Sequence, residues 1–96
     1  MQLIALLAII NRMKTKHIKI LCAIFAKPTT RTLPWSDIES LLLAAGCRVI
    51  EGNGSRVRFV SGDCVATFHR PNPTKEAKAY QVEDARKFLD LIGVKP

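Results

Sequence analysis

Several features that define common protein classes are missing from this chain of 96 residues. Its three cysteines are odd in number and form no Cys-x-x-Cys pair, so neither a disulfide framework nor a zinc site of ordinary spacing is expected. Five glycines and five prolines are too few for a collagen-like or low-complexity chain. There is no Gly-x-Gly-x-x-Gly and no phosphate-binding loop, so no recognisable nucleotide-binding motif is present. With these classes excluded, the sequence is that of a small globular protein.

The three cysteines indicate a cellular compartment rather than a catalytic or metal-binding role. Cys22, Cys47 and Cys64 each lie in an apolar stretch of sequence. Free cysteine packs as a small apolar residue, and reduced thiols are typical of the cytosol. We therefore predict three buried, reduced cysteines in a cytoplasmic protein.

Acidic residues are scarce. Eight Asp and Glu stand against fifteen Lys and Arg, which gives a net charge of +7 and a sequence pI near 9.8. Such an excess attracts polyanions through counterion release and the long-range field. Nucleic acid is the first candidate partner, an acidic protein the second and an anionic membrane a distant third. Charge alone does not decide among these partners, because many small basic proteins bind no nucleic acid.

One long apolar run opens the chain. Residues 1–10 are almost all apolar, but ten residues are too few to span a bilayer. No positive charge precedes the run and no small-residue cleavage site follows it, unlike in a signal peptide. We interpret residues 1–12 either as the product of a start codon assigned upstream of Met13 or as an extra turn of the first helix. Residues 13–96 are expected to form a single domain.

Three segments have helical patterns. Ile18, Leu21, Cys22 and Phe25 recur at helical spacing and predict a helix over residues 16–25. A second helix is predicted over residues 37–45, with Ser36 and Glu39 as a capping box and Gly46 as its end. A third is predicted over residues 79–91, with Gly93 ending it.

Strand patterns fill the middle of the chain. Residues 48–51, 55–60 and 64–70 alternate in the manner of strands, and two short segments rich in Gly, Asn and Asp separate them. The expected order is helix, helix, three strands, helix. This order predicts an α+β fold in which the helices cover one face of an antiparallel sheet and the other face is open to water.

The second hairpin allows its register to be deduced. If Gly62 and Asp63 are the two residues of a tight turn, Arg56 lies opposite His69 and Arg58 opposite Thr67. Directly opposed side chains share a face of the sheet. Slipping the strands by one residue would bury the arginines, so the pattern favours a basic outer face.

His69 has an ordinary and a chemical interpretation. The ordinary one is an exposed histidine just before a Pro-rich turn, and the arginines would then be merely solvated. In the chemical one, the imidazole accepts the proton of a ribose 2′-hydroxyl and the arginines stabilise charge on the phosphate. The other histidine, His17, is expected at the surface of the first helix.

Two segments carry a family resemblance. Residues 52–59, Gly-Asn-Gly-Ser-Arg-Val-Arg-Phe, and residues 68–76, Phe-His-Arg-Pro-Asn-Pro-Thr-Lys-Glu, resemble the HicA toxin family in order and spacing. The likeness covers about residues 13–96. It implies a fold like a double-stranded-RNA-binding domain, ribonuclease activity on mRNA in the cytoplasm, and neutralisation by a HicB-like acidic antitoxin. It implies no metal or small-molecule cofactor, and no membrane.

The sequence departs from the family at one important position. Many members carry Gly-Ser-His-His on the second strand, whereas Ser55 is followed here by Arg56. A Pro-His-Pro of many members is replaced by Pro71-Asn72-Pro73. We therefore expect His69 as the catalytic acid/base, with Arg56, Arg58 and Lys75 binding the phosphates. Two alternatives stay open: a module that binds RNA or DNA without cleaving it, and a domain whose basic face serves only an acidic protein.

Overall fold

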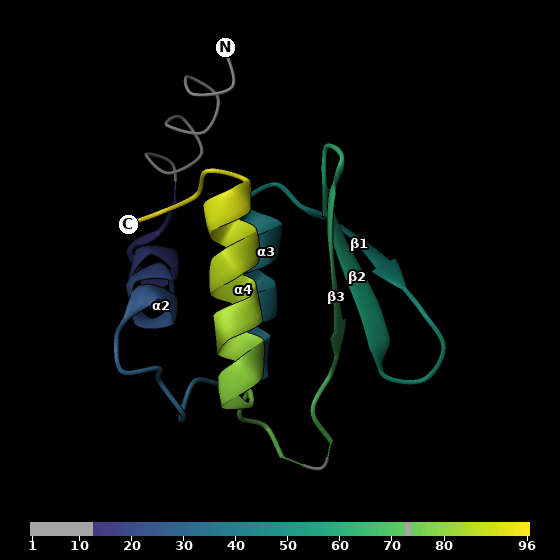
Figure 1. Ribbon diagram of the computed structural model, residues 1–96, viewed down its shortest axis with the longest axis horizontal. Coiled ribbons are helices and arrows are strands. Elements are labelled where there is room, and N and C mark those ends of the chain that lie inside the picture. Colours follow the sequence, from purple (N-terminus) through teal and green to yellow (C-terminus); the bar gives the residue numbers. More distant parts are fainter. Residues whose placement is uncertain (1–12, 73) are drawn as a thin grey trace.

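In the part of the chain that the structure describes, three helices and a three-stranded antiparallel sheet follow one another in the predicted order (Figure 1). The computed structural model describes residues 13–72 and 74–96, so both interpretations of residues 1–12 lie outside the described residues. The α+β assignment is confirmed, and the order is consistent with a fold like a double-stranded-RNA-binding domain. The elements are helix α2 (Thr15–Phe25), helix α3 (Trp35–Ala44), strands β1 (Arg48–Glu51), β2 (Arg56–Ser61) and β3 (Cys64–His69), and helix α4 (Ala79–Leu91).

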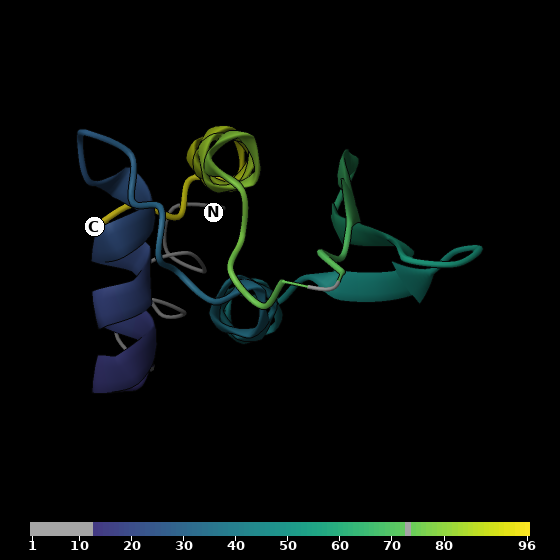
Figure 2. The ribbon, with the colours of Figure 1, turned by 90° about the horizontal axis from the view of Figure 1, so that it is seen from below.

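The elements form three layers (Figure 2). The sheet, with strand order β1-β2-β3, packs one face against the pair α3 and α4. Helix α2 contacts α3 and α4 from the side away from the sheet. The prediction that the helices cover one face of the sheet is confirmed, but α2 covers its neighbouring helices rather than the strands.

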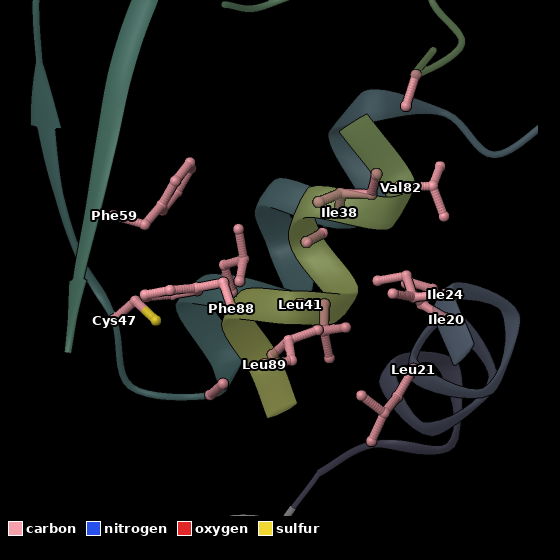
Figure 3. Packing of buried hydrophobic residues seen from close by; sticks show 14 of the residues in the cluster. Ile20, Leu21, Ile24, Ile38, Leu41, Cys47, Phe59, Val82, Phe88 and Leu89 are labelled. Atoms are coloured by element: carbon pink, nitrogen blue, oxygen red, sulfur yellow. The ribbon is translucent and has the colours of Figure 1, made fainter. Parts of the chain in front are cut away.

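The core lies on both sides of the α3–α4 pair (Figure 3). On the sheet side, Phe59 and Phe68 join Trp35 of α3 in an aromatic cluster, with ring centroids 5.1–6.4 Å apart. Their tilted and edge-on contacts are the arrangements that aromatic pairs prefer. On the other side, residues of α2 point at the same pair of helices. The side chains that are fully enclosed include Leu21, Ile24, Ile38, Leu41, Leu42, Val57, Phe59, Val82 and Leu89.

The buried side of α2 differs from the predicted one. Ile20, Leu21 and Ile24 are buried, whereas Ile18 is 40% exposed and Cys22 is exposed. Of the three thiols predicted to be buried, Cys47 is buried and Cys64 in β3 is only half-buried, and the prediction is wrong for Cys22. The physical reason is that apolar residues nearly surround this helix, so that helical spacing alone does not select the side that packs.

The beginning of α3 also differs. The helix begins at Trp35, two residues before the predicted start, and no side chain caps it. The Trp35 amide donates to the Lys75 carbonyl at 2.9 Å, and the Asp37 amide donates to the Pro34 carbonyl at 3.1 Å. Because backbone carbonyls satisfy these amides, the predicted capping box of Ser36 and Glu39 does not form.

The hairpin register is confirmed pair by pair. Arg56 lies opposite His69, Arg58 opposite Thr67, and Val57 opposite Phe68. Gly62 has a φ of +58° and no described non-glycine residue has a positive φ, as in a two-residue type II′ turn. Glycine at this position therefore fixes the register on which the outer face depends.

Within residues 13–72 and 74–96, no helix is both long enough and apolar enough to cross a membrane.

His17 was expected at the surface of the first helix, but it is half-buried. Its Nε2 lies 2.8 Å from the Ser40 hydroxyl oxygen on α3.

Candidate functional site

The outer face of the sheet carries the candidate residues. Val57, Phe59 and Phe68 point into the core, so their neighbours along the strands project outward. The register places Arg48 and Ile50 of β1 on this outer face as well, opposite Val60 and Arg58. Within the three described strands, no acidic side chain projects from it. The outer face consists of Arg48, Ile50, Arg56, Arg58, Val60, Val65, Thr67 and His69.

The hydrogen-bond pattern brings Arg56 and His69 close together. The Arg70 amide donates to the Ser55 carbonyl at 2.9 Å, so Ser55 and Arg70 form a hydrogen-bonded pair of the ladder. In an antiparallel ladder such pairs alternate with non-hydrogen-bonded ones, which makes Arg56 and His69 a pair of the second kind. Non-hydrogen-bonded pairs have Cα atoms only about 4.5 Å apart and the closer side chains.

Ser55 lies close to the imidazole. The Ser55 hydroxyl oxygen lies 3.5 Å from His69 Nδ1, which is a long hydrogen bond. Both side chains are exposed. Among the described residues Nε2 has no hydrogen-bond partner, so this nitrogen is the one open to a ligand.

The turn before β2 lies close against Arg56. The Gly52 amide donates to the Arg56 carbonyl at 2.9 Å. A Cβ atom at Gly52 would lie 3.2 Å from both Arg56 Cβ and the Arg56 carbonyl oxygen, tighter than an ordinary contact. Glycine at this position leaves the arginine stem room beside the turn.

Gln81 holds the end of β3 from the helix side. Its side chain is only 2% exposed, and its Nε2 donates to the His69 carbonyl at 2.7 Å. Its Oε1 accepts from the Lys78 amide at 3.0 Å, which caps the start of α4. One buried amide therefore connects the backbone of the candidate catalytic residue to the last helix.

Replacing Gln81 by methionine is expected to destabilise the protein by about 1–3 kcal/mol, because the His69 carbonyl and the Lys78 amide lose a buried partner. Urea unfolding measures this change in free energy. The matched control is Lys87→Gln, at an exposed position of the same helix, for which a change within about 0.5 kcal/mol is expected. Equal effects of the two substitutions would show that the amide does not anchor β3.

Arg70 points away from the outer face. Its Nε and Nη2 donate to the two carboxylate oxygens of Glu39 at 3.0 and 2.9 Å, while Nη1 and Nη2 donate to those of Glu51 at 2.7 and 2.9 Å. Trp35 Nε1 adds a further bond to Glu39 at 2.8 Å. The guanidinium thus joins α3, β1 and the end of β3, and its donors are engaged by carboxylates of this chain.

This network changes the acidity of its members. The hydrogen bonds from Arg70 lower the pKa of Glu39 and of Glu51, and both carboxylates raise the pKa of the Arg70 guanidinium. All three groups are therefore charged at neutral pH. Burial raises the pKa of the Cys47 thiol to about 11, so this thiol is protonated and is a poor nucleophile near neutral pH.

Lys75 lies apart from the other three predicted site residues. It is exposed on the segment that connects β3 to α4, and its carbonyl accepts from the Trp35 amide. No hydrogen bond or ion pair among the described residues joins it to Arg56, Arg58 or His69. The structure therefore brings together three of the four predicted residues on one face of the sheet.

Sequence reasoning missed the residues that hold the site. Gln81 had one detectable signal, because glutamine three residues after a helix cap is half of a capping box. The pairing of Arg70 with two carboxylates that are distant in the sequence had none. Within residues 13–72 and 74–96, no three His, Cys, Asp or Glu side chains are grouped closely enough to hold a metal ion.

Comparison with known protein families gives a match over most of the described elements. The family model described as "HicA toxin of bacterial toxin-antitoxin" matches residues 35–91, from the beginning of α3 to the end of α4. No curated protein and no solved structure matches the chain significantly. The matched region covers more than half of the 96 residues and contains the whole outer face of the sheet. The chain therefore belongs to the HicA toxin family.

Proposed function

We propose that this toxin is an endoribonuclease that cleaves mRNA in the cytoplasm, with His69 as its acid/base. The observation that carries the proposal is the opposed pair of Arg56 and His69 on a sheet face from which the three described strands project no acidic side chain. Such a face attracts a phosphate backbone, and the pair offers a proton acceptor beside a cation.

The chemistry requires only groups of this chain and of the RNA. His69 Nε2 takes the proton of a ribose 2′-hydroxyl while the 2′-oxygen attacks the adjacent phosphorus. The bond to the 5′-oxygen breaks, and this oxygen receives the proton from the imidazolium. The products are a 2′,3′-cyclic phosphate and a 5′-hydroxyl, and no metal is required in this route.

The arginines have separate roles in the proposal. Arg56 lies beside His69 and stabilises the charge that builds on the phosphate being attacked. Arg58 is two residues further along β2 and binds a neighbouring phosphate. Lys75, on its separate segment, is proposed as a weaker contact to the backbone beyond them.

Incubation of the purified protein with a labelled RNA tests the proposal. Cleavage is expected to continue in EDTA and to yield 2′,3′-cyclic phosphate ends. A strand of the same sequence with 2′-deoxyribose throughout is expected to stay intact, because it lacks the nucleophile. Retarded but intact RNA would instead identify a binding module.

The partner of the toxin is also a proposal. We infer an antitoxin of the HicB type whose acidic surface covers the outer face, because opposite charges both attract it and block the site. If the protein neither binds nor cleaves RNA at low salt, the basic face serves an acidic protein alone.

A further inference from the structure

The free edge of β3 lacks the residues that usually protect the edge strand of a sheet. Strand β3 ends the sheet on one side. Because the Arg70 amide donates to the carbonyl of Ser55, the residue before β2, alternation turns the N–H and C=O groups of Val65, Thr67 and His69 away from β2. The strand contains no lysine and no proline, the residues that commonly block edges.

One position of this edge already has a substitute partner. The His69 carbonyl accepts the side-chain amide of Gln81, as it would accept the N–H of a fourth strand. No described residue offers a comparable bond to the outward groups of Val65 and Thr67. At this edge the His69 carbonyl therefore has a hydrogen-bond partner, whereas the outward backbone groups of Thr67 and Val65 have none among the described residues.

A hollow lies between this edge and α4. Residues 65–68 of β3 and Asp84, Lys87, Phe88 and Leu91 of α4 line it. A second hollow, lined by residues 61–64 and 91–93, adjoins it at Leu91. Leu91 is 68% exposed, the largest exposure among the described large apolar side chains, and Val65 is 53% exposed. Apolar surface and unpaired backbone groups therefore occur side by side.

We propose that β3 and this hollow bind an extended segment of a partner protein as a fourth strand, a segment in which apolar and acidic residues alternate. Side chains of a strand alternate between the two faces of the sheet. Those on the inner side would contact Phe88 and Leu91. Those on the outer side would extend the row that contains Arg58 and Thr67 or the row that contains Arg56 and His69.

The positive charge of the outer face and the greater length of β3 both favour an acidic, extended segment at this edge. Asp84 and Lys87 offset each other in the hollow, so the excess positive charge lies on the outer side, where acidic residues are favoured. A second copy of the chain would bring another +7 and its own arginines. The other edge strand, β1, is only four residues long and carries Arg48 and Glu51, which makes it a poorer template.

NMR titration of the full chain with a synthetic peptide of about eight residues tests the proposal. The peptide alternates glutamate and valine. The amides of Val65 and Thr67 and the methyl groups of Leu91 are expected to shift the most. A peptide of the same composition with its glutamates and valines in two blocks, and the alternating peptide N-methylated along one edge, are both expected to bind at least about tenfold more weakly.

A variant of the protein gives the complementary test. Thr67→Pro removes an outward N–H that the β2–β3 ladder does not use, whereas Thr67→Val keeps it. Only the proline variant is expected to lose peptide binding, by about tenfold or more. Shifts confined to Arg56, Arg58 and His69, or no binding of the alternating peptide, would overturn the proposal. Because no RNA is present, the result does not depend on whether the chain is a nuclease.

Discussion

His69→Ala is expected to slow RNA cleavage at least about 100-fold while leaving RNA affinity within a few fold of the unaltered protein. The imidazole is the one proton acceptor of its kind on the outer face of the described strands, so its removal leaves water as the base. It contributes little to packing, because its side chain is exposed. Single-turnover cleavage rates and filter binding on the same RNA separate the two effects.

Two controls make the result specific. His17→Ala removes the other histidine, which lies on α2 and contacts Ser40, and it is expected to cleave at nearly the original rate. Imidazole added to the buffer is expected to restore part of the activity of His69→Ala but not to accelerate the unaltered protein. Undiminished cleavage by His69→Ala would exclude this residue as the acid/base.

The sheet could be predicted from the sequence because local rules and burial agree there. Gly62-Asp63 specifies a tight turn, and a one-residue slip would place arginines in the core beside Phe68. Both constraints select the same register. Hence the pairing of Arg56 with His69 was predictable without any knowledge of the helices.

The helix faces were less predictable. In α2 nearly every residue from Ile18 to Phe25 is apolar or small, so the side that packs is chosen by the surfaces of α3 and α4 rather than by periodicity. The start of α3 illustrates the same limit. Its first amides are satisfied by carbonyls of Lys75 and Pro34, and a tertiary contact of this kind leaves no local signal.

The support of the candidate site was the least predictable part. Arg70 binds Glu39 and Glu51, which are 31 and 19 residues away in the sequence. Gln81 reaches back twelve residues to His69. Such contacts depend on how the layers stack, whereas the outer-face residues depend only on strand alternation. The sequence therefore indicates the candidate groups but not the residues that hold them.

The double variant Arg56→Gln/Arg58→Gln is expected to bind RNA about 10- to 100-fold more weakly near 0.1 M salt. If each arginine neutralises one phosphate, the slope of log affinity against log salt should become shallower by about 1.4 for single-stranded RNA. Fluorescence anisotropy at several salt concentrations measures both quantities. A uniform loss without a change in slope would show that the arginines shape the face rather than bind phosphate.

Charge-matched and single variants resolve what each arginine does. Lys27→Gln/Arg31→Gln removes the same charge from exposed positions between α2 and α3, and a much smaller change in affinity is expected. Arg58→Gln should raise KM with little change in kcat, because it binds a phosphate remote from the reaction. Arg56→Gln should lower kcat as well, because it lies opposite His69 and stabilises charge that appears only in the transition state. Separate effects on KM and kcat would therefore assign substrate binding to Arg58 and stabilisation of the transition-state charge to Arg56.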